Sequence, residues 1–226
     1  MVVDGPDAAP WTMTGECVIA LARRRAADRS PLPDGLHPVP GPAVVIAESY
    51  TRSPVGPYLA FGVAEPVRHR GRIGLCFTTV AVNSPDVRVA GRQGWGFPAE
   101  LGNLGWSSRA GERELVWLER GISIVGRSHR LAWPAVVPMR SLQHLDDGPV
   151  VAPGWLRGLV HRAHVEIGVD DEDPLMWLAG RHAGASVSGL RVTMRPARHA
   201  EAPLPAPLLG RPNPAPPVPA ESSAQT

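Results

Sequence analysis

The sequence predicts a mainly β fold in which an antiparallel sheet is closed, or nearly closed, into a barrel. Two observations support this prediction. Short apolar runs bounded by glycine, proline and other turn residues recur along the chain, and few segments have the spacing of an amphipathic helix. A chain of 226 residues also favours one domain with a sizeable buried core.

Each predicted strand is an apolar or alternating run that ends at turn residues. The strands are expected at Glu16–Leu21, Pro42–Ser49, Tyr58–Ala64, Leu75–Val82, Glu114–Glu119, Ile122–Arg127 and Ser186–Arg195. Arg23–Pro40 is rich in charged and turn-forming residues and is expected to be a surface connection, and Arg68–Arg72 a polar turn. Arg120 and Gly121 separate two of the strands and indicate a hairpin.

The clearest helix signal begins at Ser84. Serine is a favoured N-cap, Pro85 suits the first helical position, and Asp86 places an acid in the first turn. We expect this helix to end near Gln93, before Gly94. Two further helices are predicted from their spacing of apolar residues, at Trp155–Val165 and Pro174–His182.

The chain is expected to comprise a flexible N-terminus over residues 1–9, one domain over residues 10–196 and a disordered tail over residues 197–226. Eight of the residues from Ala202 to Ala220 are proline. A segment of this composition buries too little apolar surface to offset the entropy lost on ordering.

The composition of the chain indicates which kinds of partner and which cellular compartment to expect. The formal charge is only +2, so neither a nucleic-acid nor a membrane partner is expected. The only cysteines, Cys17 and Cys76, have apolar neighbours and are expected to be buried reduced thiols. The N-terminal residues lack a basic segment followed by an apolar one, so a cytoplasmic protein is expected.

Gly91–Gly102 reads Gly-Arg-Gln-Gly-Trp-Gly-Phe-Pro-Ala-Glu-Leu-Gly and resembles the active-site segment of the acetoacetate decarboxylase superfamily. Other segments resemble family segments in the same order: Pro10–Glu16, Glu48–Tyr58, Asn83–Arg92 and 178–194. The resemblance implies a β-barrel or cone with flanking helices and an internal pocket. It also implies that the chain can form homo-oligomers.

The departures from the family motif concern its charged residues. The family continues with aromatic-Pro-Lys-Lys or Pro-Lys-Glu, and its first lysine forms a Schiff base with a keto acid. That lysine aligns with Ala99 and its neighbour with Glu100, and all 23 basic residues of this chain are arginine. Other charged pocket residues of the family align with Ala60 and with positions near Val45 and Gly15. The resemblance therefore implies a pocket for a less charged ligand, without imine chemistry.

Glu100 is the candidate acid or base, because a carboxylate at the mouth of an aromatic, desolvated pocket can have a raised pKa. The alternative is that Glu100 faces solvent or pairs with Arg92. Tyr58 or Asn83 could polarise a substrate carbonyl, although Asn before Ser-Pro is more often a turn residue. The other residues expected in the substrate pocket are Trp95, Phe97, Ala99, Ala60, Arg92 and Arg52.

Some polar residues have a simpler interpretation, which we favour. Glu48 and Arg52 are more simply a surface ion pair than a polar rim of the pocket. Arg92 is expected to hold the loop of the motif by hydrogen bonds. Glu65 follows the Tyr58 strand and could turn inward to replace a lost pocket acid, but we do not favour this role.

No metal or cofactor is expected. His161, His164 and Glu166 lack a third ligand at a recognised spacing, and a solvated helix face explains them better. The glycines of Gly91–Gly96 follow a helix, whereas those of a phosphate-binding loop precede one.

Three functions remain open. The first is a noncovalent cyclase, dehydratase or isomerase that acts on a carbonyl-bearing or polyketide-like molecule of secondary metabolism, with Glu100 as acid or base. The second is a non-catalytic protein that binds a small molecule. The third is a lysine-independent decarboxylase of β-keto acids, which needs a cation such as Arg52 or Arg92 near the substrate carboxylate.

Overall fold

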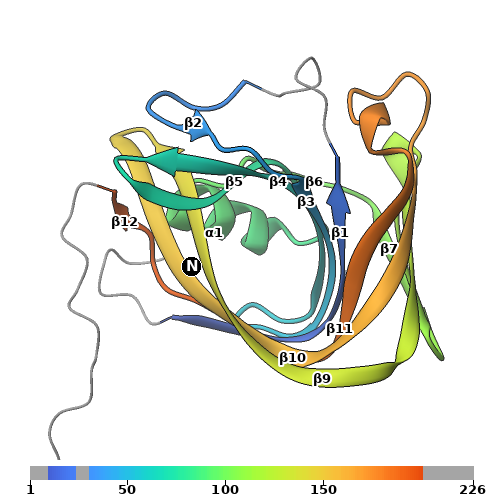
Figure 1. Ribbon diagram of the computed structural model, residues 1–226. Coiled ribbons are helices and arrows are strands. Elements are labelled where there is room, and N and C mark those ends of the chain that lie inside the picture. Colours follow the sequence, from blue (N-terminus) through green and yellow to red (C-terminus); the bar gives the residue numbers. More distant parts are fainter. Residues whose placement is uncertain (1–9, 24–30, 201–226) are drawn as a thin grey trace, which may run out of the picture.

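The computed structural model describes residues 10–23 and 31–200, and its polypeptide is built almost entirely from β-strands (Figure 1). The predictions for residues 1–9 and 201–226 lie outside the described residues. The strands are β1 (Trp11–Ala22), β2 (His37–Pro38), β3 (Ala43–Arg52), β4 (Tyr58–His69), β5 (Arg72–Val82), β6 (Ala99–Leu101), β7 (Leu104–Arg109), β8 (Glu112–Trp117), β9 (Ile122–Leu145), β10 (Gly148–Gly168), β11 (Gly180–Met194) and β12 (Arg198–His199). The helical elements are α1 (Pro85–Trp95) and two 3₁₀ turns, η2 (Leu118–Arg120) and η3 (Met176–Leu178).

The strands form one sheet that curls into a nearly closed ring. Its order is β12-β10-β11-β1-β3-β4-β5-β9-β8-β7, and β9 also pairs with β10, which brings the two sides of the ring together. The pairings are antiparallel except those of β5 with β6 and with β9. The mainly antiparallel, nearly closed sheet predicted from the sequence is confirmed. Residues 198–199 pair with β10, so folded structure continues past residue 196.

The predicted helix at Trp155–Val165 is wrong, because these residues lie in β10 and pair with β9. Val165 is buried whereas His164 is exposed, which is the alternation of a strand. The helical spacing arose because Trp155 and Leu159 are apolar although they are exposed, so apolar residues occur on both faces of the strand.

The predicted helix at Pro174–His182 is also wrong, apart from the single turn of η3. Gly180 follows that turn and has φ 124°, in the left-handed region. A right-handed helix cannot continue through such a residue, and the chain enters β11 there instead.

The helix predicted after Ser84 is confirmed as α1. The Ser84 side chain accepts a hydrogen bond from the Val87 amide, and Pro85 occupies the first helical turn. The helix continues to Trp95, about half a turn beyond the predicted end, and closes at Gly96, whose φ is 69°. Figure 1 shows α1 lying against the ring of strands, which gives the cavity described below its second wall.

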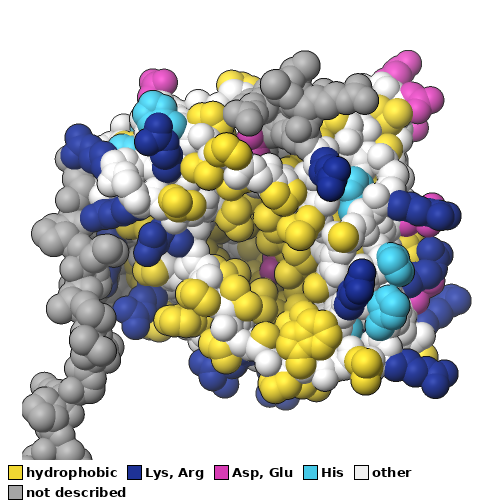
Figure 2. All heavy atoms as spheres, viewed as in Figure 1, with side chains coloured by type: hydrophobic (Ala, Val, Ile, Leu, Met, Phe, Trp, Pro, Cys, Tyr) yellow, Lys and Arg dark blue, Asp and Glu magenta, His cyan; other side chains and the backbone are white. Residues whose placement is uncertain are grey.

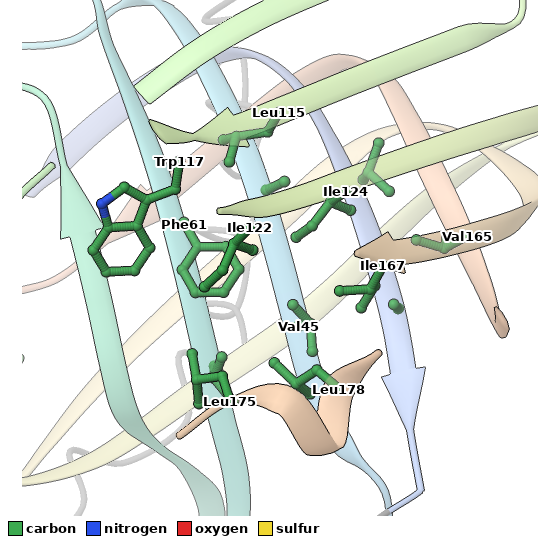
Figure 3. Close-up of a cluster of buried hydrophobic side chains, with 14 of the residues drawn as sticks. Val45, Phe61, Leu115, Trp117, Ile122, Ile124, Val165, Ile167, Leu175 and Leu178 are labelled. Atoms are coloured by element: carbon green, nitrogen blue, oxygen red, sulfur yellow. The ribbon is translucent and has the colours of Figure 1, made fainter. Parts of the chain in front are cut away.

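The sheet of β1, β3 and β4 separates two hydrophobic clusters. Phe61, Leu115, Trp117 and Ile122 belong to one cluster and converge in Figure 3. The other cluster includes Tyr50, Tyr58 and α1 residues, and it surrounds the cavity. Burial on both faces explains why the middle of β4 is an almost continuous apolar run.

Two further expectations concern cysteines and membranes. Cys17 and Cys76 are free and buried, as predicted. Among the described residues, no helix has both the length and the apolar character needed to cross a bilayer.

Candidate functional site

A cavity of about 130 Å³ lies between α1 and the inner face of the β3–β4–β5 sheet. Figure 2 shows the molecule hollowed at this place, with hydrophobic side chains around the hollow and one acidic group visible in its depth. Among the residues that the structure describes, Glu48 is the only acidic one in the cavity lining. The site is therefore an apolar chamber that holds one carboxyl group.

Small residues leave the space for this cavity. Ala60, Gly91 and Ala99 all line it, and a Cβ added at Gly91 would meet the Cβ of Ala99 at 3.5 Å. Trp95 fixes α1 over the cavity, because its Nε1 donates a hydrogen bond to the Arg195 carbonyl at 2.9 Å. Larger side chains at the three small positions would fill the chamber.

Glu48, Tyr50 and Tyr58 form one polar group in the lining, which also includes Ser141 and Arg140 of β9. Tyr50 Oη donates a hydrogen bond to Glu48 Oε1 at 2.6 Å. Tyr58 Oη lies 3.0 Å from Met13 Sδ, a weak acceptor, and its ring packs 4.9 Å from that of Tyr50. Glu48 Oε2 has no hydrogen-bond partner among the described residues, so it remains available to a ligand.

The apolar surroundings change the acidity of these groups. Burial raises the pKa of the Glu48 carboxyl to about 7, although the hydrogen bond from Tyr50 acts in the opposite direction. Burial, followed by the nearby Glu48 carboxylate, raises the pKa of both Tyr50 and Tyr58 well above the ordinary phenol value. Near neutral pH the cavity thus holds un-ionised phenols and a carboxyl that is present in both protonation states.

The strand alternation of β3 directs Glu48 into the cavity. Ile46, Glu48 and Tyr50 line the cavity, whereas Val45 and Ala47 belong to the hydrophobic cluster on the opposite face. Glu48 was not expected in the cavity, because a surface ion pair with Arg52 was the simpler interpretation of the sequence. The alternating run Val-Val-Ile-Ala-Glu-Ser-Tyr was the signal that could have placed it.

The favoured surface pair of Glu48 with Arg52 is wrong. Four strand residues span roughly 13 Å, so the two side chains cannot meet along β3 even though they share a face. Arg52 is exposed and is not part of the cavity lining. The expectation that Arg52 belongs to the substrate pocket does not agree with this placement.

Five of the predicted site residues do lie around the cavity: Tyr58, Trp95, Phe97, Ala99 and Ala60. Trp95 and Phe97 have nearly parallel rings with centroids 6.1 Å apart, and Phe97 meets Phe77 edge-on at 5.1 Å. Ala99, at the position where the family has its lysine, is 2% exposed and faces the cavity. The structure thus brings the aromatic motif and the small residues together as expected.

Glu100 lies outside the cavity, contrary to prediction. Its side chain is 54% exposed, and its Oε1 is 3.8 Å from Arg120 Nη1. The reason is the alternation of β6: because Ala99 points into the cavity, the next residue must point away. The alternative placement of Glu100 facing solvent is therefore the one observed, with Arg120 as its partner in place of Arg92.

Asn83 and Arg92 also lie outside the cavity lining. Asn83 Oδ1 accepts a hydrogen bond from the Leu59 amide at 2.8 Å, which ties the start of β4 to the end of β5. Arg92 is exposed and borders a separate polar cleft beside His144 and Asp146. Neither is placed to contact a ligand in the cavity.

Glu65 and Arg140 are two further charged residues whose side chains could reach the cavity. Glu65 is buried, but it lies opposite Cys76 in the β4–β5 pairing and does not line the cavity. Arg140 borders the cavity, but its neighbours Met139 and Ser141 occupy the inward-facing positions of β9. The Arg140 guanidinium instead donates through Nη1 to the Ile73 carbonyl. Alternation thus turns this cation away from the chamber.

The described residues contain no group of three or more histidine, cysteine or acidic side chains that could hold a metal ion. His161 is tied to the His129 carbonyl and the Ser188 hydroxyl, and Glu166 pairs with Arg127. These residues lie on a strand and not on the helix face expected from the sequence.

Comparison with known proteins agrees with this architecture. Residues 4–125 match the family model described as Acetoacetate decarboxylase (ADC). None of the curated proteins matches the chain.

Three solved structures illustrate the likeness. The enduracididine biosynthesis enzyme MppR complexed with pyruvate has 18% identity and a TM-score of 0.65, over 84% of this chain and 90% of that one. The acetoacetate decarboxylase from Legionella pneumophila subsp. pneumophila str. Philadelphia 1 has 14% identity and a TM-score of 0.63, over 84% and 86%. An acetoacetate decarboxylase-like enzyme from Sphingomonas wittichii RW1 has 14% identity and a TM-score of 0.57, over 83% and 89%. At these identities the likeness shows a shared fold.

Proposed function

Because this chain belongs to the acetoacetate decarboxylase family and yet contains no lysine, we propose that it is a noncovalent enzyme that moves a proton on a small, uncharged carbonyl compound. Glu48 takes the role of acid or base that sequence analysis gave to Glu100. The observation that carries this proposal is the single carboxyl in an apolar cavity, with a pKa of about 7. A general acid or base works best when its pKa is close to the working pH.

In this geometry, three side chains have separate roles in the proposed reaction. Tyr50 holds Oε1 of Glu48, which leaves Oε2 to exchange a proton with the ligand. Tyr58 can exchange its weak contact with Met13 Sδ for a hydrogen bond to a ligand carbonyl oxygen. Both tyrosines stay un-ionised, so they can act as donors.

This arrangement supports isomerisation or dehydration. The Glu48 carboxylate takes a proton from the carbon next to the carbonyl, and the electron pair of that C–H bond forms an enolate whose oxygen accepts from Tyr58. Return of the proton to another carbon completes an isomerisation. Its delivery to a hydroxyl on the β carbon releases water and forms a C=C bond, which completes a dehydration.

The size and lining of the cavity set the substrate class. A cavity of about 150 Å³ lined by apolar groups can hold benzene, and this one is of similar size. No cation faces the chamber from the described residues that line it. A compact neutral ligand therefore fits better than a carboxylate or a long polyketide chain. The pyruvate bound to MppR is also a small carbonyl compound, but it carries a carboxylate, so it supports only the carbonyl part of this ligand class.

The binding-protein alternative shares the same cavity and predicts retention of a ligand without turnover. The decarboxylase alternative brings a carboxylate beside Glu48 with no facing cation to offset the repulsion. Proton transfer is therefore the function that the cavity supports best.

The test is mass spectrometry of small enones, β-hydroxy ketones and β-keto acids incubated with the protein, Glu48→Gln and Glu100→Gln. Loss of water or isomerisation, abolished in Glu48→Gln and kept in Glu100→Gln, is the expected result. Release of CO₂ that persists in Glu48→Gln would overturn the proposal in favour of decarboxylation. A ligand retained in native spectra without conversion would overturn it in favour of binding.

A further inference from the structure

A buried serine hydroxyl belongs to the cavity wall and is not used in the proposed reaction. Ser141 is only 6% exposed, and its Oγ has no hydrogen-bond partner among the residues that the structure describes. Its strand neighbours, Leu75 on β5 and Ala152 on β10, also line the cavity, so the three residues share the inner face of the ring. Buried polar groups are rarely left without a partner, which points to one that enters the cavity.

The order of the strands places Ser141 across the cavity from Glu48. β4 and β5 separate β3 from β9 along one side of the ring, and β1, β11 and β10 separate them along the other. Glu48 therefore projects inward from one wall, and Ser141 projects inward from the wall that faces it. A ligand whose carbonyl oxygen accepts a hydrogen bond from Tyr58 thus turns its far side toward β9.

Ser186 shows how a buried serine is accommodated elsewhere in this fold. It is fully buried on β11 and lies outside the cavity lining. Its Oγ is 2.5 Å from Ser128 Oγ and accepts a hydrogen bond from Arg113 Nη1 at 3.4 Å, so its polar group is satisfied within the protein. The Ser141 hydroxyl has no such arrangement. An alanine would fill nearly the same space there without the free-energy cost of an unpaired hydroxyl, so a purely structural role does not account for the serine.

We propose that the Ser141 hydroxyl binds a second oxygen of the ligand, a role that rests on the proposed function, in which the reacting carbonyl lies at Tyr58. The substrate class is then a neutral carbonyl compound with a further carbonyl or hydroxyl group on its far side. A hydroxyl both donates and accepts, and rotation about the Cα–Cβ bond of Ser141 turns it toward either group. Ser141 is a positioning residue, since Glu48 carries the proton. A compound with one oxygen leaves this hydroxyl unpaired and is disfavoured.

The test measures Kd for two pairs of uncharged ketones by chemical-shift titration of the ¹⁵N-labelled full chain. One pair is cyclohexanone and the cyclohexanedione with carbonyls on opposite ring carbons, which are close to benzene in size. The longer pair is acetylcyclohexane and the acetylcyclohexanone whose ring carbonyl lies opposite the acetyl group. In at least one pair the unaltered protein is expected to prefer the diketone, and Ser141→Ala to reduce that preference roughly five- to tenfold.

Ser186→Ala is the matched control, because it removes a buried serine hydroxyl outside the cavity lining. This variant is expected to keep the preference for the diketone and to unfold at a lower urea concentration, since it leaves the partners of Ser186 unpaired. Ser141→Ala is expected to unfold at the same or a higher urea concentration than the unaltered protein.

Two results would overturn the role of Ser141. One is an unchanged ratio of Kd values in Ser141→Ala for both pairs, which would leave water as the partner of the hydroxyl. The other is a loss of stability in Ser141→Ala as large as that in Ser186→Ala, which would show a partner within the fold.

The proposed function is tested separately in the same samples. Exchange of the ketones' α-hydrogens with deuterated solvent reports proton transfer and should disappear in Glu48→Gln. Exchange that depends on Glu48, without an effect of Ser141→Ala on the Kd ratio, would overturn the role of Ser141 alone. An effect of Ser141→Ala without such exchange would overturn the proposed proton transfer and support the contact of Ser141 with the ligand.

Discussion

Tyr50 and Glu48 lie two residues apart on β3, on the same face of the strand, and are joined by a 2.6 Å hydrogen bond inside the cavity. The bond favours the ionised carboxyl, whereas burial favours the protonated one. The balance between these two effects places the pKa near 7 and allows Glu48 to give or take a proton.

Removal of the Tyr50 hydroxyl is expected to shift this balance. In Tyr50→Phe the Glu48 pKa rises further, because the carboxylate loses a donor while burial remains. The basic form then becomes populated only at higher pH, and the rising limb of kcat/KM against pH moves up by roughly one to two units. Tyr58→Phe provides the control, since Tyr58 makes no hydrogen bond to Glu48. Equal shifts in both variants would contradict the assigned role of Tyr50.

Glu48 should make the stability of the fold depend on pH. Its pKa is about 7 in the folded chain against an ordinary value of 4.5, so the folded chain binds the extra proton. The stability conferred by this proton is complete below pH 4.5 and is lost as the pH rises through 7. Relative to Glu48→Gln, the free energy of unfolding should fall by roughly 2 to 3 kcal/mol between pH 5 and pH 8. Urea unfolding of both proteins across this range measures the difference, and a constant difference would show that Glu48 is not buried as described.

Ala99 offers a direct test of how the cavity relates to the family chemistry. Because Ala99 faces the cavity, Ala99→Lys should place an amine in apolar surroundings that lower its pKa and favour imine formation. Incubation with acetone, a small neutral ketone, and borohydride should then add the mass of a reduced adduct to the variant and not to the unaltered protein. Glu100→Lys is the matched control, since that side chain points away from the cavity. An adduct on Glu100→Lys alone would reverse the assignment of the two positions.

Much of the fold could be predicted because its signals are local. Ser84 and Pro85 predicted the start of α1, and apolar runs predicted the cores of most long strands. The prediction failed at β10, where Trp155 and Leu159 are apolar for a reason other than burial.

The site was harder to predict than the fold. The aromatic and small residues of the cavity lie in one motif, so Trp95, Phe97 and Ala99 could be recognised together. Glu48 lies about fifty residues earlier, and only the curvature of the sheet brings it to the same cavity. Glu100 was placed wrongly because the direction of its side chain depends on which alternate residues of β6 face the cavity. A sequence motif does not specify this.

Nuclear magnetic resonance of protein labelled with ¹³C at the glutamate side-chain carboxyl can show whether Glu48 carries a proton near neutral pH. The resonance missing from the Glu48→Gln spectrum belongs to Glu48, and its chemical shift is followed as the pH is raised. We expect a titration midpoint of about 7. A midpoint near the ordinary carboxyl value of 4.5 would mean that the carboxyl is solvated and ionised, which would contradict the proposed chemistry.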